Sequence, residues 1–289
     1  MSGVSTRVWI LLLSLSAGDL VLADVRGIAI SGWWPVIVVG AALLGIALGH
    51  RSFGIHQRLA AMAEWTLLWI LFSVSGALLT YLAAANGGPL YDANIAAIDA
   101  QLGFDWGGWY AFVAAHPLLR LPLSLAYGSL LAQIMLSVAW FCYLGWDHRN
   151  AELLTNVTLG LLLTTAVFCL YPTLGPCVGI ADFHDAYLGD LVALRNGNLP
   201  SVDVMVMKGV IAFPSFHAVF AVLFTYAHRH SPSFPLAAAL NLVMLISIPS
   251  EGGHYLVDIF GGITVGALSI IATSVLPSRA PALATATTA

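Results

Sequence analysis

The chain has 289 residues, of which 60% are hydrophobic and only 8% are charged, and its formal net charge is -4. Because soluble domains carry about 25% charged residues, this composition excludes an ordinary soluble fold and indicates a membrane protein. Its ten Lys and Arg residues form no basic stripe, so we expect no nucleic-acid partner. The three cysteines provide no disulfide framework.

Eight apolar segments approach the length of about 20 residues that a membrane helix needs. We expect these helices at residues 8–23, 28–48, 59–84, 122–144, 153–171, 213–228, 235–248 and 254–276. The first could be a signal peptide, but the segments that follow favour an uncleaved helix. The predicted fold class is therefore all-α, a polytopic membrane bundle of about six to eight transmembrane helices. We expect N-terminal helices in residues 1–85, a membrane core in residues 86–276 and a disordered tail in residues 277–289.

The positions of the basic residues predict how the chain is oriented in the membrane. With the N-terminus in the cytoplasm, six of the ten basic residues lie in cytoplasmic loops. The exceptions are Arg26, Arg120, Arg195 and Lys208. This orientation predicts a multi-pass protein of the cell membrane in which His217 and His254 both lie at the extracytoplasmic face.

Two of the predicted outer loops are long, and the first covers residues 86–121. It combines apolar residues at helical spacing with aspartates and aromatic residues, namely Ile95, Ile98, Leu102, Asp92, Asp99, Asp105, Trp106, Trp109 and Tyr110. This pattern predicts an amphipathic helix lying in the membrane interface on the outer side, with aromatic anchors. Such a helix would be a lid, a lipid entry guide or a plain connector.

The second long loop covers residues 172–212 and leads directly to His217. It begins with the rigid turn sequence Tyr171-Pro172-Thr173-Leu174-Gly175-Pro176. It carries the charged residues and histidine Asp182, His184, Asp185, Asp190, Arg195, Asp203 and Lys208. Loops held by a rigid scaffold often supply binding residues, so we expect some of these side chains to contact a ligand.

His254 and Asp258 are four residues apart, which places them on one face of a helix. A carboxylate in that position accepts the Nδ1 proton of the imidazole and leaves Nε2 free to act as a nucleophile or base. Gly252 and Gly253 leave room for a ligand near the backbone. A lone His-x-x-x-Asp pair is also compatible with a helix cap and a packing contact.

The stretch Phe213-Pro214-Ser215-Phe216-His217 opens another apolar segment. Ser215 is a candidate helix cap, and the free N–H groups of a first turn form an anion site. A histidine in that turn can protonate a leaving oxygen. Together, the two histidines and Asp258 favour phosphoryl transfer without a metal or other cofactor. A zinc site built from His217, His254 and Asp258 remains an alternative.

These residues resemble the second and third motifs of the type-2 phosphatidic acid phosphatase superfamily, Pro-Ser-x-His and Ser-Arg-x5-His-x3-Asp. The pattern is closer to the branch with inositol phosphorylceramide synthases and sphingomyelin synthases. Residues 98–106 are also similar to a segment that recurs in bacterial members. The resemblance implies that His254 is phosphorylated, that Asp258 orients it, and that His217 is the general acid. It also implies that Ser215 lies at the phosphate, and we expect Gly253 to lie there as well.

The sequence departs from the family pattern in two places. The first motif, Lys-x6-Arg-Pro, is absent, and Ile248 stands where the third motif has its arginine. Arg195 and Lys208 are the candidate replacements for these phosphate-binding cations. The resemblance implies a lipid phosphatase or phosphotransferase of the membrane, with a lipid phosphate or phospholipid as substrate and water or a hydroxylated lipid or polyol as acceptor. The alternatives are a lipid transporter or scramblase, and a non-catalytic member of the same scaffold.

Overall fold

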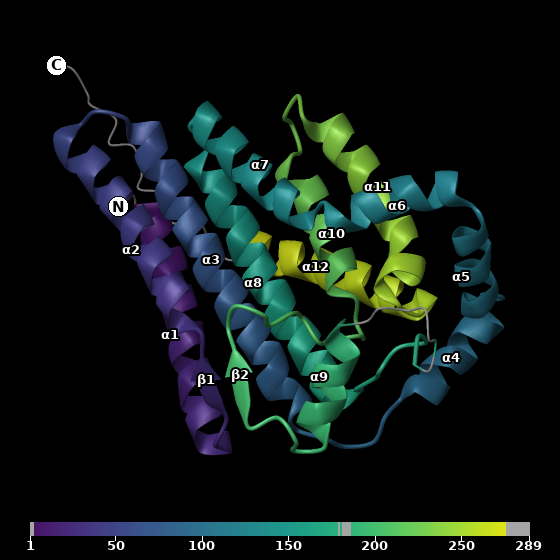
Figure 1. The fold of residues 1–289 in the computed structure, drawn as a ribbon. Coiled ribbons are helices and arrows are strands. Elements are labelled where there is room, and N and C mark those ends of the chain that lie inside the picture. Colours follow the sequence, from purple (N-terminus) through teal and green to yellow (C-terminus); the bar gives the residue numbers. More distant parts are fainter. Residues whose placement is uncertain (1–2, 179, 181–185, 276–289) are drawn as a thin grey trace.

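The structure is a computed structural model that describes residues 3–178, 180 and 186–275. These residues form twelve helices and one pair of three-residue strands (Figure 1), which confirms the predicted all-α fold class. The tail at residues 277–289, Asp182, His184 and Asp185 lie outside the described residues.

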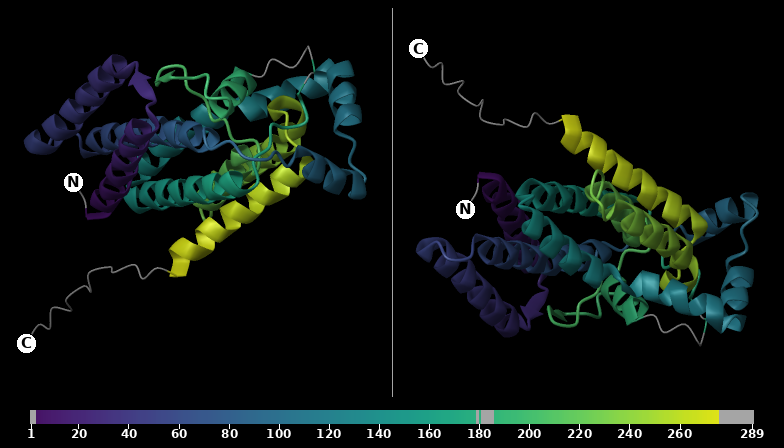
Figure 2. Two further views of the ribbon diagram at one scale, coloured as in Figure 1. Left: turned by 90° about the horizontal axis from the view of Figure 1, so that it is seen from below. Right: turned by 90° about the horizontal axis from the view of Figure 1, so that it is seen from above.

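Three long helices open the chain: α1 (Gly3–Arg26), α2 (Trp33–Phe53) and α3 (Gln57–Ala84). Helix α3 is buried along most of its length, whereas Ala47 is the one residue of α2 that is buried. Helix α2 is therefore an outer helix that packs mainly on α3. Figure 2 shows α2 and α12 (Leu256–Val275) on opposite sides of the bundle.

The second predicted helix, residues 28–48, begins later than expected. Residues Ala29–Ser31 form strand β1 instead, which pairs in parallel with β2 (Ser201–Asp203) of the second long loop. Gly32 then adopts φ 78°, and a side chain there would lie 1.9 Å from Asp203 Oδ1. Glycine is required at this junction because of the positive φ and the close approach of Asp203.

The predicted span at residues 122–144 is divided into two helices. Helix α6 (Pro117–Gly128) and helix α7 (Leu130–Leu144) meet at Ser129 with a bend of 52°. The Ser129 hydroxyl donates to the carbonyl of Ala126 at 2.7 Å, and a side-chain bond of this kind competes with regular helix hydrogen bonds. The bend carries α6 across one end of the bundle, where it packs along α11 (Phe234–Gly252).

The remaining helices are α4 (Asp92–Gln101), α5 (Trp106–Ala115), α8 (Asp147–Leu170), α9 (Ala186–Arg195) and α10 (Phe216–Ala227). Helix α10 has only twelve residues, or about 18 Å, too short to cross a bilayer by itself. It lies inside the bundle against α7, α8, α11 and α12. Its aromatic side chains join the main core, where Phe224 stacks on Trp69 of α3 at 6.2 Å between ring centroids.

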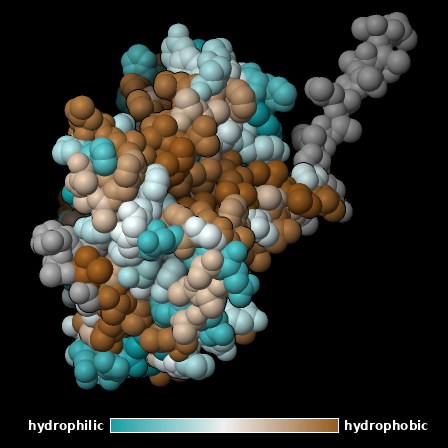
Figure 3. Space-filling view, turned by 90° about the vertical axis from the view of Figure 1, so that its right-hand side faces the viewer, coloured by the Kyte–Doolittle hydropathy of each residue, from teal (hydrophilic) through white to brown (hydrophobic). Residues whose placement is uncertain are grey.

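Six of the described helices are long and apolar enough to cross a membrane, namely α1, α2, α3, α8, α11 and α12, and the bent pair α6–α7 would be a seventh. The chain is therefore described as a multi-pass membrane protein. Figure 3 shows one face on which hydrophobic residues gather across the upper middle, with hydrophilic residues above them and at the lower edge.

Candidate functional site

The site is built around the start of α12. The Nδ1 atom of His254 lies 3.1 Å from Asp258 Oδ2, as the spacing of four residues predicts, and Asp258 is fully buried. The same carboxylate oxygen accepts the backbone N–H of Tyr255 at 2.9 Å. These two contacts fix the plane of the His254 ring and commit Nδ1, so Nε2 is the ring nitrogen available to a bound group.

A second carboxylate, Asp99 of α4, holds the same helix start from outside. Its oxygens accept the backbone N–H groups of Leu256 at 2.7 Å and Val257 at 3.0 Å. Asp99 is buried, whereas its neighbour Ile98 is exposed. A helix is present as α4 in the first long loop, but it does not have the separate apolar and polar faces that the sequence predicts. Asp99 and Ile95 are both buried, whereas Ile98 and, directly after the helix, Leu102 are exposed.

We expect Asp99→Asn to lower both stability and activity. Each N–H group is bound by a different carboxylate oxygen, and asparagine would place an NH2 donor where one of these oxygens stands. The loss of a charge-assisted hydrogen bond costs about 1–3 kcal/mol. A displaced helix start would also move His254, for which we expect about a tenfold or greater loss of turnover. Melting temperature and kcat of the purified protein measure the two effects. Asp24→Asn, at an exposed position on α1, is the control, and an unchanged kcat in Asp99→Asn would remove the positioning role.

The start of α10 is joined to α12 by backbone contacts. Ser215 occupies the N-cap position of α10, and its N–H donates to the backbone carbonyl of Asp258 at 3.0 Å. A side chain at Gly262 would lie 2.3 Å from the Ser215 carbonyl oxygen, so the helices need glycine there to approach this closely. The Ser215 hydroxyl makes no cap hydrogen bond, contrary to expectation, and within the described part of the chain it is buried without a partner.

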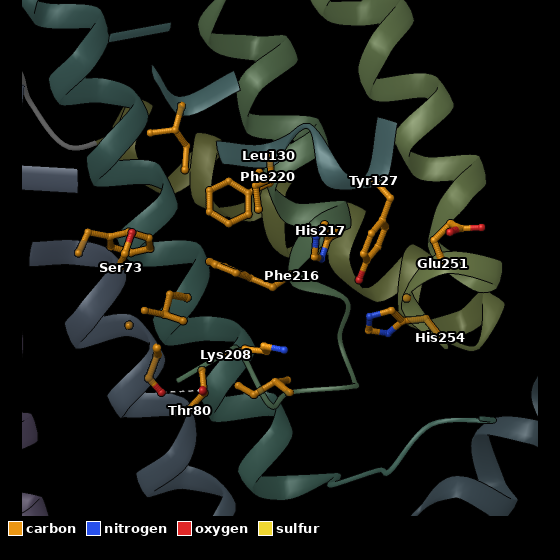
Figure 4. A pocket seen from close by; sticks show the side chains of 18 residues that line it. Ser73, Thr80, Tyr127, Leu130, Lys208, Phe216, His217, Phe220, Glu251 and His254 are labelled. Atoms are coloured by element: carbon orange, nitrogen blue, oxygen red, sulfur yellow. Dashed lines mark hydrogen bonds between the residues drawn. The ribbon is translucent and has the colours of Figure 1, made fainter. Parts of the chain in front are cut away.

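His217 and His254 line one cavity of about 470 Å³. Figure 4 shows both histidines at one end of it, together with Tyr127 of α6. The ring of Tyr127 stacks on His217 with a centroid distance of 4.1 Å and an angle of 15° between the planes. Histidines that are 37 residues apart in the sequence therefore share one cavity.

The two candidate cations have different surroundings. Lys208 lines the cavity (Figure 4). Arg195 is not among the residues that line it, and its guanidinium donates to the backbone carbonyls of Gly87, at 3.2 Å, and Gly88. Burial lowers the pKa of Arg195, and the nearby Asp92 carboxylate opposes that shift. Lys208, but not Arg195, thus lines the cavity that the two histidines share.

The glycines beside His254 have separate functions in the fold. Gly253 ends α11 in the left-handed region, with φ 62°, which explains why glycine stands there. Gly252, and not Gly253, is the one of the pair that lines the cavity. Across the described residues, no three His, Cys, Asp or Glu side chains are grouped so that they could hold a metal ion. His217, His254 and Asp258, which the sequence suggested as an alternative zinc site, therefore do not form such a group.

Sequence reasoning missed three residues of this region: Asp99, Tyr127 and Glu251. Asp99 lies within residues 98–106, which resemble a segment that recurs in bacterial family members, and that resemblance is the signal that could have pointed to its role. Tyr127 lies in an apolar run with no distinguishing pattern. Glu251 also lines the cavity, and it accepts a hydrogen bond from the Ser124 hydroxyl of α6 at 2.5 Å.

Comparison with known protein families gave one match. A family model described as the PAP2 superfamily matches residues 93–272, which is well over half of the chain. These residues include both histidines, Asp258, Lys208 and Tyr127. Neither the curated proteins nor the solved structures gave a match.

Proposed function

Because the chain belongs to the PAP2 superfamily, whose members are generally phosphatases, we propose that it is a lipid phosphatase or a lipid headgroup phosphotransferase that works through a phosphohistidine at His254. The observation that carries this proposal is the cavity that His217 and His254 share, together with the hydrogen bond between Asp258 and Nδ1 of His254. That arrangement supplies a nucleophile, its orienting group and a second group able to carry a proton.

In the proposed first step, Nε2 of His254 attacks phosphorus, and the bond from phosphorus to the oxygen of the leaving alcohol breaks. His217 gives its proton to that oxygen, so the alcohol departs neutral. In the second step, water or another hydroxyl group returns its proton to His217 and attacks phosphorus, which releases His254. The ammonium group of Lys208 is the cation in the lining that would stabilise the phosphoryl oxygens.

The residues that line the cavity support a substrate with an apolar chain. Away from the histidines, its lining is largely hydrophobic and comes from α3, α7, α8 and α10 through Phe72, Gly76, Ala77, Leu130, Ile134, Leu161 and Phe220. We call this part the apolar arm. It extends to Ser73, which is exposed on α3 (Figure 4). A lipid could therefore enter from the side of the bundle with its phosphate at the histidines, which we place at the extracytoplasmic face by the distribution of basic residues.

The experiment that tests the function is turnover of a long-chain lipid phosphate by the purified protein in lipid nanodiscs. Release of inorganic phosphate identifies a phosphatase. Transfer to an added lipid alcohol or polyol, detected by mass spectrometry of the lipid products, identifies the synthase-like activity that the sequence resemblance favours. Absence of both products across lipid phosphates and phosphodiesters would contradict the proposal.

We expect Lys208→Ala to lower kcat/KM by at least about tenfold, equivalent to about 1.4 kcal/mol of transition-state stabilisation. Arg195→Ala is the matched comparison, since its guanidinium is bound to backbone carbonyls rather than exposed to the cavity. We expect that variant to change kcat/KM less than Lys208→Ala does. The reverse order, measured with the same lipid phosphate, would assign the phosphate clamp to Arg195.

We expect Ala77→Trp to select against long-chain substrates. Ala77 lines the apolar arm, and an indole there would occupy space that a lipid chain needs. Turnover of a long-chain lipid phosphate should fall by about tenfold or more, while turnover of the short ester p-nitrophenyl phosphate is retained. Leu20→Trp, at an exposed position on α1, is the control. Equal losses for both substrates would mean that the lipid chain does not occupy the apolar arm.

A further inference from the structure

We propose that Tyr127 is a further residue of the reaction, whose hydroxyl binds the phosphoryl group while its ring holds His217 in place. This inference rests on the proposed function and adds a residue to the same site. Tyr127 lines the cavity with both histidines (Figure 4). The near-parallel stacking of its ring on His217, at 4.1 Å, restricts rotation of the imidazole.

The fold holds Tyr127 in this place through contacts of α6 with the end of α11. Ser124, one turn before Tyr127, donates to Glu251, and Arg120 Nε lies 3.6 Å from the other oxygen of Glu251. Glu251 is followed directly by Gly252, Gly253 and His254. One helix thus contacts both the segment that carries His254 and, through Tyr127, the ring of His217. Helix α6 is turned by 52° from α7 at Ser129.

Gly252 leaves the space that the tyrosine hydroxyl occupies. A side chain at position 252 would place its Cβ 2.7 Å from Tyr127 Oη and 2.8 Å from Cδ2 of His254. Both distances are too short for non-bonded atoms, so only glycine fits there without displacing one of the rings. The hydroxyl of Tyr127 and the imidazole of His254 therefore lie on the same side of Gly252.

The chemistry of the step gives this hydroxyl a use. When a phosphoryl group is transferred, negative charge spreads over its three equatorial oxygens. Fixed hydrogen-bond donors aimed at these oxygens stabilise the transition state. The lining contains one cation, Lys208, and one carboxylate, Glu251, among the described residues. A phenol donates a hydrogen bond without adding charge. Tyr127 is thus placed to supply a neutral donor between the attacking histidine and the acid.

The test compares Tyr127→Phe with the unchanged protein in two measurements, which are binding of orthovanadate by calorimetry and kcat/KM for a lipid phosphate. The variant keeps the ring and loses only the hydroxyl. We expect both quantities to weaken by about tenfold or more, with an unchanged melting temperature. Tyr143→Phe, at an exposed position on α7, is the matched control and should change neither.

The positioning part has its own readout. Tyr127→Leu also removes the ring beside His217, so it should lose more activity toward alkyl phosphates, whose leaving oxygen needs a proton, than toward p-nitrophenyl phosphate. In addition, Gly252→Ala should weaken vanadate binding, and its effect should be less than additive with that of Tyr127→Phe because both act on one hydroxyl. Equal losses toward the two esters would leave the stacking without a role in proton transfer.

The outcomes separate this inference from the proposed function. If the unchanged protein turns over substrate, and Tyr127→Phe matches it in turnover and vanadate binding, the role of Tyr127 is wrong while the histidine mechanism stands. If the unchanged protein binds vanadate but shows no turnover, the vanadate affinities alone test the role of Tyr127: weaker binding by Tyr127→Phe supports it, and equal binding contradicts it. If it neither binds vanadate nor turns over substrate, both proposals fail.

Discussion

Replacement of His254 by alanine is expected to reduce turnover by roughly a thousandfold or more, since removal of a covalent nucleophile leaves only binding and electrostatic stabilisation. The expectation follows from the hydrogen bond between Nδ1 and Asp258, which directs Nε2 of His254 to the cavity. The same variant should lose the phosphoenzyme itself. Brief incubation with a ³²P-labelled lipid phosphate and quenching in alkali should leave label on the unchanged protein and none on His254→Ala, because phosphohistidine survives alkali but not acid.

His148→Ala is the matched control for this variant, because His148 is exposed in the first turn of α8. It should retain both turnover and label. Melting temperatures of the three proteins show whether the substitution has disturbed the fold. Undiminished phosphate release by a folded His254→Ala protein would contradict the proposed nucleophile, and label that persists in it would place the covalent step on another residue.

The local part of this site was predictable from the sequence because it depends on helix geometry. A spacing of four positions from His254 to Asp258 places both side chains on one face of a helix, whatever surrounds it. The long apolar helices were also predictable, because the length and composition of an apolar segment are sufficient to identify a membrane helix. The exceptions are the late start of α2 and the break at Ser129, where contacts with Asp203 and a serine-to-carbonyl bond override the apolar pattern. A third exception is α10, which is too short to cross a bilayer.

The residues that contact the His254 segment and His217 depend on how elements distant in the sequence pack together. Residue spacing and composition do not predict that packing. Asp99 reaches two N–H groups that follow it by more than 150 residues. Tyr127 stacks on His217 from α6, which turns away from α7 by 52° at a break that the apolar pattern does not mark. Loop charges were the hardest to place. Arg195 and Lys208 look alike in the sequence, yet two carbonyls hold the first, while the second lines the cavity.

Replacement of His217 by alanine is expected to have an effect that depends on the leaving group. An alkyl phosphate, such as a lipid phosphate, expels a strongly basic alkoxide unless a proton is supplied, so turnover should fall by roughly a thousandfold. p-Nitrophenyl phosphate expels a weakly basic phenolate that needs little protonation, and we expect its loss to be closer to about tenfold. His254→Ala should reduce both substrates alike, because the nucleophile is needed whichever alcohol departs.

The ratio of the two losses is therefore the diagnostic quantity. It assigns the proton to His217 without requiring a knowledge of how well the variant binds substrate, since each substrate is compared with itself. It also distinguishes a general acid from a residue that merely shapes the cavity, because the stacked contact with Tyr127 is removed for both substrates. Losses of equal size for the two esters would assign His217 to structure or binding, and the leaving oxygen would then need another proton donor among the residues that line the cavity.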